Sequence, residues 1–208
     1  MKVISTNVSE KRTITIGGEV LETGMYKIPV QEGVFIGEKS VENDVVIDRR
    51  FHGGPDKACY LYGKNNYKYF ENLYPNATWE IGMFGENITL DEVDESNLNI
   101  GDVYQIGEAQ IQIAQPRIPC NKFGYRLGSP LAIKTFAQSD YPGIYVRVLK
   151  PGKVKVGDEM VLLKPAKEQL SLVQLFRVLT NKSAHTDKFK SIVANPNVPD
   201  RCKTKLRK

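Results

Sequence analysis

The chain has 208 residues, of which 41% are hydrophobic and 25% charged, and its formal net charge is +5. This length can bury one sizeable core, so we expect one domain, or one with a small appendage. Its apolar runs span a few residues, far short of the roughly 20 that cross a bilayer. The N-terminal stretch becomes polar too early for a secretory signal. We therefore expect a cytoplasmic protein with no membrane partner.

Short runs of β-branched and aromatic residues, separated by Gly, Pro, Asn and Asp, dominate the first 163 residues. This pattern is typical of strands and turns. It predicts nine strands, at 2–7, 27–30, 34–36, 57–62, 87–90, 103–106, 110–115, 143–149 and 159–163. Their number and spacing favour a barrel or a sandwich. Apolar residues at helical spacing add short helices at 63–74 and 129–138.

Two segments repeat one local design, in which a Gly-Asp pair directly precedes a predicted strand. They are Gly101-Asp102 and Gly157-Asp158. A small residue followed by a side chain that can bond the nearby backbone is typical of a tight turn. We interpret both as corners of the β domain, without a catalytic role.

The pattern changes after Pro165. Leu172, Leu175, Phe176 and Leu179 follow the i, i+3, i+4, i+7 spacing of an amphipathic helix over 168–179. Asp187 can cap a second helix through residue 193, and the Pro-Asp pair at 199–200 can open a third that ends near 206. The sequence therefore predicts a mainly β domain over 1–164 and a small three-helix subdomain over 165–208.

The excess positive charge lies in this tail, where residues 164–208 contain 11 Lys or Arg against 3 Asp or Glu. Such an asymmetry can mark an arm that binds nucleic acid. It is also typical of a solvated helical appendage. We favour the appendage and expect no nucleic-acid partner.

The cysteines limit the possible metal chemistry. Cys59, Cys120 and Cys202 form no CxxC pair, so neither a disulfide framework nor a zinc knuckle is expected. The histidines are His52 and His185, too few for a His-rich zinc site. Any metal centre must rely mainly on other ligands.

The densest group of polar residues is the stretch RRFHGGPDKACYLY at 49–62. Arg49, Arg50, His52 and Lys57 flank a Gly-Gly turn, which lets backbone amides approach a ligand closely. This pattern is typical of an anion-binding loop. An ordinary basic surface turn explains it equally well.

A second group surrounds one cysteine in the stretch QPRIPCNKFG at 115–124. Two prolines stiffen the exit from a strand and fix the direction of Cys120, while Arg117 and Lys122 favour its thiolate, the form that binds metals. A buried structural cysteine is the alternative. Two further segments could complete a pocket: GMFGENITL at 82–90, which contains Asn87, and GIYVRVLKPGKVKVGDEM at 143–160, which contains Arg147. Arg147 either meets an anionic partner or faces outward.

These four segments occur in the order and approximate spacing of the MOSC domain family (molybdenum cofactor sulfurase C-terminal domain), and the chain resembles its YiiM-like branch over nearly its whole length. The resemblance implies a β-barrel similar to a pyruvate kinase domain, with short helices and a C-terminal three-helix subdomain. It also implies molybdenum cofactor (molybdopterin), with Cys120 as the protein ligand of the metal. The basic and amide groups expected to contact the anionic cofactor are Arg50, His52, Lys57, Asn87, Arg117 and Arg147.

The resemblance further implies the reduction of N-hydroxylated compounds, such as 6-hydroxylaminopurine, to amines. Cys120 and His52 would be the catalytic residues, with His52 as the acid that protonates the departing oxygen. The chain contains neither a GxGxxG fingerprint nor a cysteine set for an iron-sulfur cluster, so electrons would come from a separate reductase. The alternative is a non-catalytic carrier of the cofactor or of its sulfur.

Overall fold

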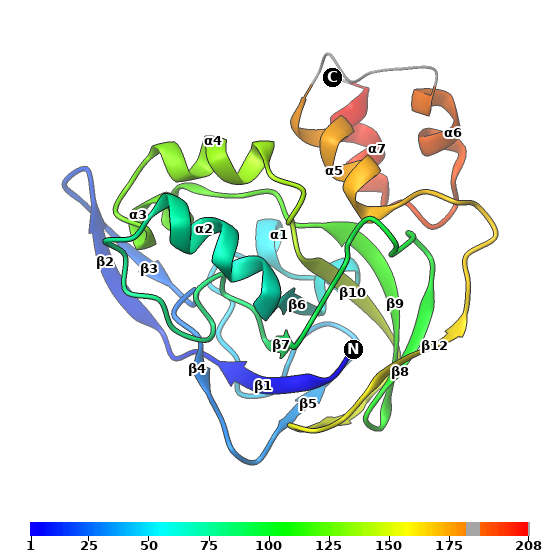
Figure 1. Ribbon diagram of the computed structural model, residues 1–208, viewed down its shortest axis with the longest axis horizontal. Coiled ribbons are helices and arrows are strands. Elements are labelled where there is room, and N and C mark those ends of the chain that lie inside the picture. Colours follow the sequence, from blue (N-terminus) through cyan, green and yellow to red (C-terminus); the bar gives the residue numbers. More distant parts are fainter. Residues whose placement is uncertain (182–187, 208) are drawn as a thin grey trace.

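The computed structural model describes residues 1–181 and 188–207, and its largest element is an eight-stranded sheet (Figure 1). The strand order is β12-β8-β9-β10-β6-β7-β1-β4. These strands are β1 (Val3–Val8), β4 (Ile28–Pro29), β6 (Cys59–Gly63), β7 (Ile88–Leu90), β8 (Val103–Ile106), β9 (Ala109–Pro116), β10 (Ile144–Lys150) and β12 (Met160–Lys164). Each coincides with one of the predicted strands.

The sheet closes on itself because the start of β1 meets the start of β12. The amide of Val3 donates to the carbonyl of Asp158 at 2.8 Å, and the amide of Met160 donates to the carbonyl of Met1 at 2.8 Å. The β6–β7 pair is parallel and the other pairs of the sheet are antiparallel. The prediction of a mainly β barrel is therefore confirmed.

Alternating side chains fill the barrel. Along β9, Ala109, Ile111 and Ile113 are completely buried, while Gln110 and Gln112 between them are only partly buried. This period of two is the pattern expected for a strand with one face on the core. It fixes the register of β9, because a shift by one residue would exchange the two faces.

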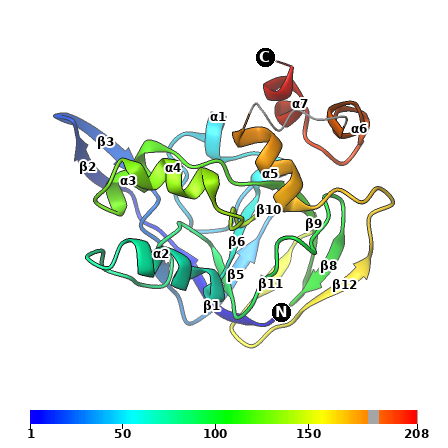
Figure 2. The same cartoon turned by 45° about the horizontal axis from the view of Figure 1, so that its top comes forward.

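A second core, made largely of aromatic rings, lies outside the barrel. The helices that cover it are α2 (Tyr67–Leu73), α3 (Asn121–Arg126) and α4 (Leu131–Gln138) (Figure 2). Phe84 stacks on Tyr62 with the ring centres 4.1 Å apart and contacts Phe123 at 5.6 Å. This packing anchors both the 82–87 turn and the start of α3 against β6.

Both Gly-Asp segments are turns, as predicted. Gly101 and Gly157 have φ angles of 101° and 96°, which favour glycine. The carboxylate of Asp102 accepts from the Asn99 amide at 2.8 Å, and that of Asp158 accepts from the Lys155 amide at 2.9 Å.

Several short elements were not predicted. They are the strands β2 (Arg12–Ile16), β3 (Glu19–Thr23) and β11 (Gly152–Val154) and the helices α1 (Arg49–His52) and α3. β2 and β3 form a projecting hairpin (Figure 1), whose turn contains Gly17 and Gly18 at φ 60° and 86°. β11 pairs with the predicted strand β5 (Val34–Ile36).

Three helices follow the barrel and lie together beside the end of β9 (Figure 2). They are α5 (Leu172–Thr180), α6 (Lys188–Ala194) and α7 (Asp200–Leu206). Ser171 and Gln174 form a capping box at the start of α5, and α5 packs against β9. The cap predicted at Asp187 lies outside the described residues.

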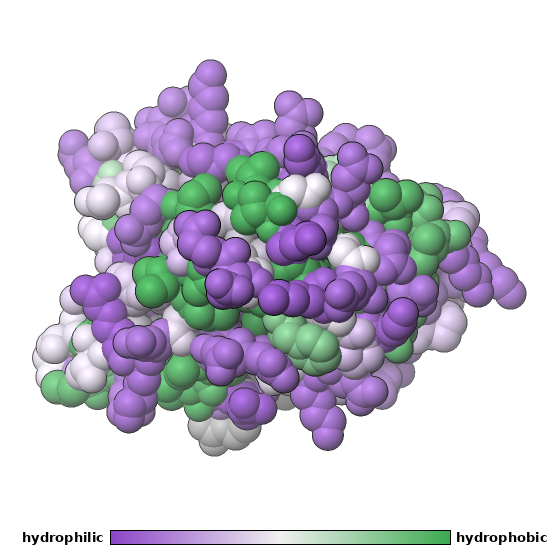
Figure 3. Space-filling model, turned by 90° about the horizontal axis from the view of Figure 1, so that it is seen from below, coloured by the Kyte–Doolittle hydropathy of each residue, from purple (hydrophilic) through white to green (hydrophobic). Residues whose placement is uncertain are grey.

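On the face shown in Figure 3, apolar residues occur in small groups between hydrophilic ones. Within the described ranges, no helix is long and apolar enough to cross a membrane.

Candidate cofactor site

Cys120 lies where β9 passes into α3, after Pro116 and Pro119. Its backbone is extended, with φ −127° and ψ 168°, and it forms the N-cap of α3. Its carbonyl accepts from the Phe123 amide at 3.0 Å, and the Phe123 ring is anchored in the aromatic core. These contacts place the backbone of Cys120 at the start of α3, next to the aromatic core.

Two pockets meet at this thiol. The first, the inner pocket, has a volume of about 740 Å³ including its open mouth. The second, the tail pocket, has about 930 Å³ measured in the same way and is bounded on one side by α7. The residues common to both linings are His52, Lys57, Cys120 and Tyr145.

The surroundings of Cys120 favour its thiolate. Burial alone would raise the pKa of this thiol, but a hydrogen bond from His52 and the nearby Arg117 guanidinium lower it from 9.0 to about 6. By contrast, burial raises the pKa of Cys59, and it raises that of Cys202 to about 11. Since the thiolate is the form that binds metals, Cys120 is the cysteine best prepared as a ligand.

Arg117 is buried and held by neutral groups. Its guanidinium donates to the carbonyl of Phe84 and lies 5.1 Å from the centre of the Tyr60 ring and 5.7 Å from that of Phe123. Such contacts fix its position without neutralising its charge. Its positive field therefore acts on Cys120 and on any anion in the inner pocket.

Lys57 is the last residue of the short helical turn at Pro55–Lys57 and also lies on the shared wall. Burial, followed by repulsion from Arg201, lowers the pKa of Lys57 to about 8. Its ammonium lies 5.5 Å from the centre of the Tyr145 ring. The structure thus brings His52, Lys57, Arg117 and Cys120 together, although they come from separate segments.

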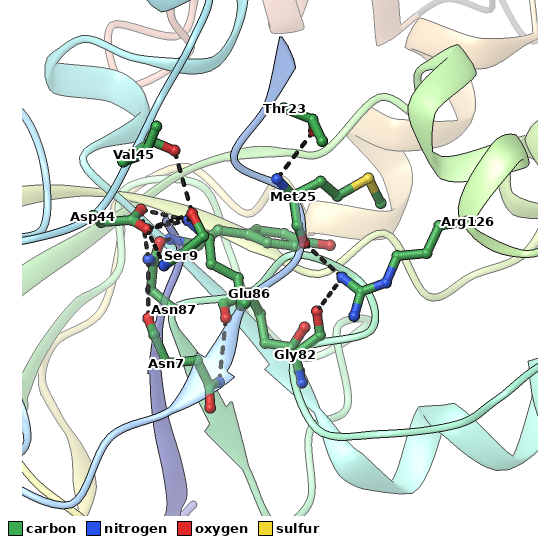
Figure 4. Close-up of polar contacts among 12 residues, drawn as sticks. Asn7, Ser9, Thr23, Met25, Asp44, Val45, Gly82, Glu86, Asn87 and Arg126 are labelled. Carbon is green, nitrogen blue, oxygen red and sulfur yellow. Dashed lines mark hydrogen bonds and ion pairs between the residues drawn. The ribbon is translucent and has the colours of Figure 1, made fainter. Parts of the chain in front are cut away.

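A buried ion pair that the sequence did not reveal forms part of the inner wall (Figure 4). The ammonium of Lys27 contacts the carboxylate of Asp44, and their side chains are only 5% and 3% exposed. Asp44 also accepts from the Ser9 amide at 2.9 Å and from the Asn87 side chain at 2.9 Å. Lys27 is the first residue of a predicted strand, but nothing in the local sequence identifies Asp44 as its partner.

Asn87 lines the inner pocket with its amide already engaged. Its nitrogen donates to Asp44 and, at 3.3 Å, to the carbonyl of Asn7, while its oxygen accepts from the Tyr60 amide at 3.3 Å. The observed contacts of Asn87 therefore orient Asp44 and connect β1, β6 and β7.

The structure does not bring Arg147 to the two pockets. Its guanidinium pairs with Asp56 and donates to Gln112 at 3.0 Å and to the carbonyl of Asn197 at 2.9 Å. It therefore joins β10 to the 55–57 turn and to the tail, and it is absent from the described linings of both pockets. The side chain of Arg50 lies outside the described residues.

The residues around Cys120 fit a ligand that brings its own donor atoms for a metal. Within residues 1–181 and 188–207, no three His, Cys, Asp or Glu side chains cluster to hold a metal ion. A metal next to Cys120 would therefore need most of its ligands from a cofactor, which the sulfur atoms of a pterin dithiolene provide. The cations of the inner pocket suit the anionic groups of such a cofactor. They are Lys39, Lys57, Arg117 and Lys122; Lys27 also lines this pocket, but Asp44 balances its charge.

Fold and site together define a β-barrel protein with a free cysteine on the wall between two pockets that are lined by several cations. The chain belongs to the MOSC domain family, which matches residues 48–161 and is associated with molybdenum cofactor binding. It is similar to the crystal structure of YiiM from Geobacillus stearothermophilus, with a TM-score of 0.80, 27% identity, and coverage of 99% of this chain and 98% of that one.

Two relatives in sequence extend this comparison. The uncharacterized protein YflK of Bacillus subtilis is 34% identical over 82% of this chain and 76% of its own length. A protein of Gibberella moniliformis named reductase is 29% identical over 79% of this chain, but over only 29% of its own length.

Proposed function

We propose that this protein binds molybdenum cofactor through Cys120 and reduces N-hydroxylated compounds to amines. The observation that carries the proposal is the thiolate-stabilising site at Cys120, placed between two pockets and surrounded by cations. Membership of the MOSC family and similarity to a protein named reductase support it.

The cofactor, when bound, would supply the two-electron redox chemistry. The residues of the chain would hold and prepare the site. Cys120 would anchor the metal, and the buried cation of Arg117 would balance the anionic charge of the cofactor. The Lys27–Asp44 pair would keep the inner wall in shape, since neither charge can easily leave its buried partner.

Reduction of an N-hydroxylamine to an amine breaks the N–O bond, consumes two electrons and two protons, and releases water. His52 lies on the wall shared by both pockets and next to Cys120. From there it could deliver a proton to the departing oxygen, as a general acid within reach of the leaving group does. The electrons would come from a separate flavoprotein or ferredoxin-type reductase.

The test is the reduction of 6-hydroxylaminopurine by anaerobically purified, cofactor-loaded protein with a chemical or enzymatic electron donor. We expect adenine to form in proportion to the donor consumed, and Cys120→Ala to abolish its formation. A loaded protein that forms no amine with any donor would favour the alternative, a carrier of the cofactor or of its sulfur.

A further inference from the structure

The tail pocket has walls from both parts of the chain. The C-terminal helices supply Leu179, Arg201, Cys202 and Lys205, and the barrel side supplies Gln115, Pro116, Ile118 and Pro119 next to the four shared residues. A molecule in this pocket would therefore contact Cys120 at one end and α7 at the other.

Several contacts fix α7 in this position. The thiol of Cys202 donates to the side-chain oxygen of Gln115 at 3.3 Å, and the Gln115 nitrogen donates to the carbonyl of Asp56 at 3.2 Å. Arg147 adds its bond to the carbonyl of Asn197, just before α7. The cations of α7 are consequently held at a set place relative to the barrel.

The charge of the tail pocket is one-sided. Its lining includes Lys57, Arg201, Lys205 and His52, and none of its described lining residues is acidic. Asp56, whose carboxylate acts on Lys57, does not line the tail pocket and forms an ion pair with Arg147. Arg201 is close enough to Lys57 to lower the pKa of Lys57. Cations held this close repel one another, so an anion between them would be stabilised by several charges at once.

We propose that the tail pocket binds a phosphate or carboxylate group of the substrate, so that the preferred N-hydroxylated substrates are anionic. This inference rests on the proposed function, because it places the N–O group near Cys120 and the anionic group against Arg201 and Lys205. The anion could instead belong to the cofactor. We assign it to the substrate because the inner pocket has cations of its own, Lys39, Arg117 and Lys122, and none of them lines the tail pocket.

Binding of two unreactive probes tests the pocket without turnover. Adenosine 5′-monophosphate and adenosine differ by the phosphate, and calorimetric titration of the cofactor-loaded, full-length protein gives both affinities. We expect the monophosphate to bind at least about tenfold more tightly than adenosine, as several charge-assisted contacts would produce. The ratio of the two affinities should fall to about one in the double variant Arg201→Gln/Lys205→Gln. Equal affinities in the wild type, or a ratio that the double variant retains, would overturn the inference.

Arg207→Gln is the matched control, because Arg207 directly follows α7 and is exposed, yet does not line the pocket. It should keep the wild-type ratio. Cofactor content separates the two sources of the anion: unchanged content in the double variant supports the substrate, whereas its loss would assign the anion to the cofactor and contradict the inference. Probe binding without any reduction of 6-hydroxylaminopurine would reject the proposed reductase activity while leaving the anion site in place.

Discussion

The pKa of Cys120 can be tested directly in the cofactor-free protein through the variant His52→Ala. The wild-type pKa of about 6, against 9.0 for an ordinary thiol, corresponds to roughly 4 kcal/mol of preferential stabilisation of the thiolate. Because the thiolate is the reactive form, wild-type alkylation should rise with pH, with a midpoint near 6, and level off above about 7. Cys59 and Cys202 should remain unmodified at pH 7, since burial raises the pKa of each.

Removing His52 takes away the hydrogen bond and the positive charge that lower this pKa, while Arg117 remains. If the midpoint rises by about one to two pH units, the thiolate fraction at pH 7 falls about two- to tenfold, and the alkylation rate with it. The assay is the rate of iodoacetamide modification between pH 5 and 9, followed by mass spectrometry. An unchanged midpoint in His52→Ala would refute this reasoning.

Lys122→Gln is the matched control. Lys122 is two residues from Cys120, but its ammonium donates to the carbonyl of Glu22 at 2.5 Å. We therefore expect the alkylation midpoint of this variant to stay at the wild-type value. A rise as large as that of His52→Ala would show that general positive charge, not the His52 contact, controls the thiol.

Three further predictions concern stability. Asp44→Ala leaves the ammonium of Lys27 buried without its carboxylate and should lower the free energy of unfolding by about 3–5 kcal/mol; a loss below 1 kcal/mol in denaturant titration would contradict the role of the pair. Glu95 is 2% exposed, and burial raises its folded pKa from 4.5 to about 7. The protonated side chain therefore contributes up to about 3 kcal/mol to the free energy of unfolding. This contribution is complete below pH 4.5 and is lost as the pH rises to 7. Glu95→Gln should flatten that part of the pH–stability curve, and an unaltered curve would reject the assignment. Arg147→Ala should cost about 1–3 kcal/mol and speed tryptic cleavage of the tail without lowering cofactor content, whereas cofactor loss from a folded variant would restore its predicted role as a cofactor contact.

Much of the barrel was predictable because it depends on local patterns. The alternation of Ile111 and Ile113 with Gln110 and Gln112 is visible in the sequence and is observed in β9. The β2–β3 hairpin was missed because few of its side chains are buried: in β2 only Ile14 is. When few side chains of a hairpin are buried, the glycines of its turn are the main sign of the hairpin in the sequence.

The candidate site was predictable only in part, because sequence shows which groups are near in the chain but not what they face. The prolines around Cys120 are local, so its fixed position could be expected. The direction of the Arg147 side chain could not be predicted, because a strand residue can face either side of the sheet. The contribution of Arg201 and Lys205 to a pocket at Cys120 depends on how the tail docks on β9, and the sequence showed only a basic tail.

The central claim is that Cys120 anchors molybdenum cofactor, and the most direct test is the molybdenum and pterin content of wild type and Cys120→Ala. Both proteins would be purified anaerobically from a host that makes the cofactor. Cys202→Ala is the control, because that thiol also lines the tail pocket but burial raises its pKa. We predict near-stoichiometric metal and pterin in wild type and Cys202→Ala, and loss of both in Cys120→Ala. Equal content in all three proteins, or none in the wild type after reconstitution, would contradict the claim.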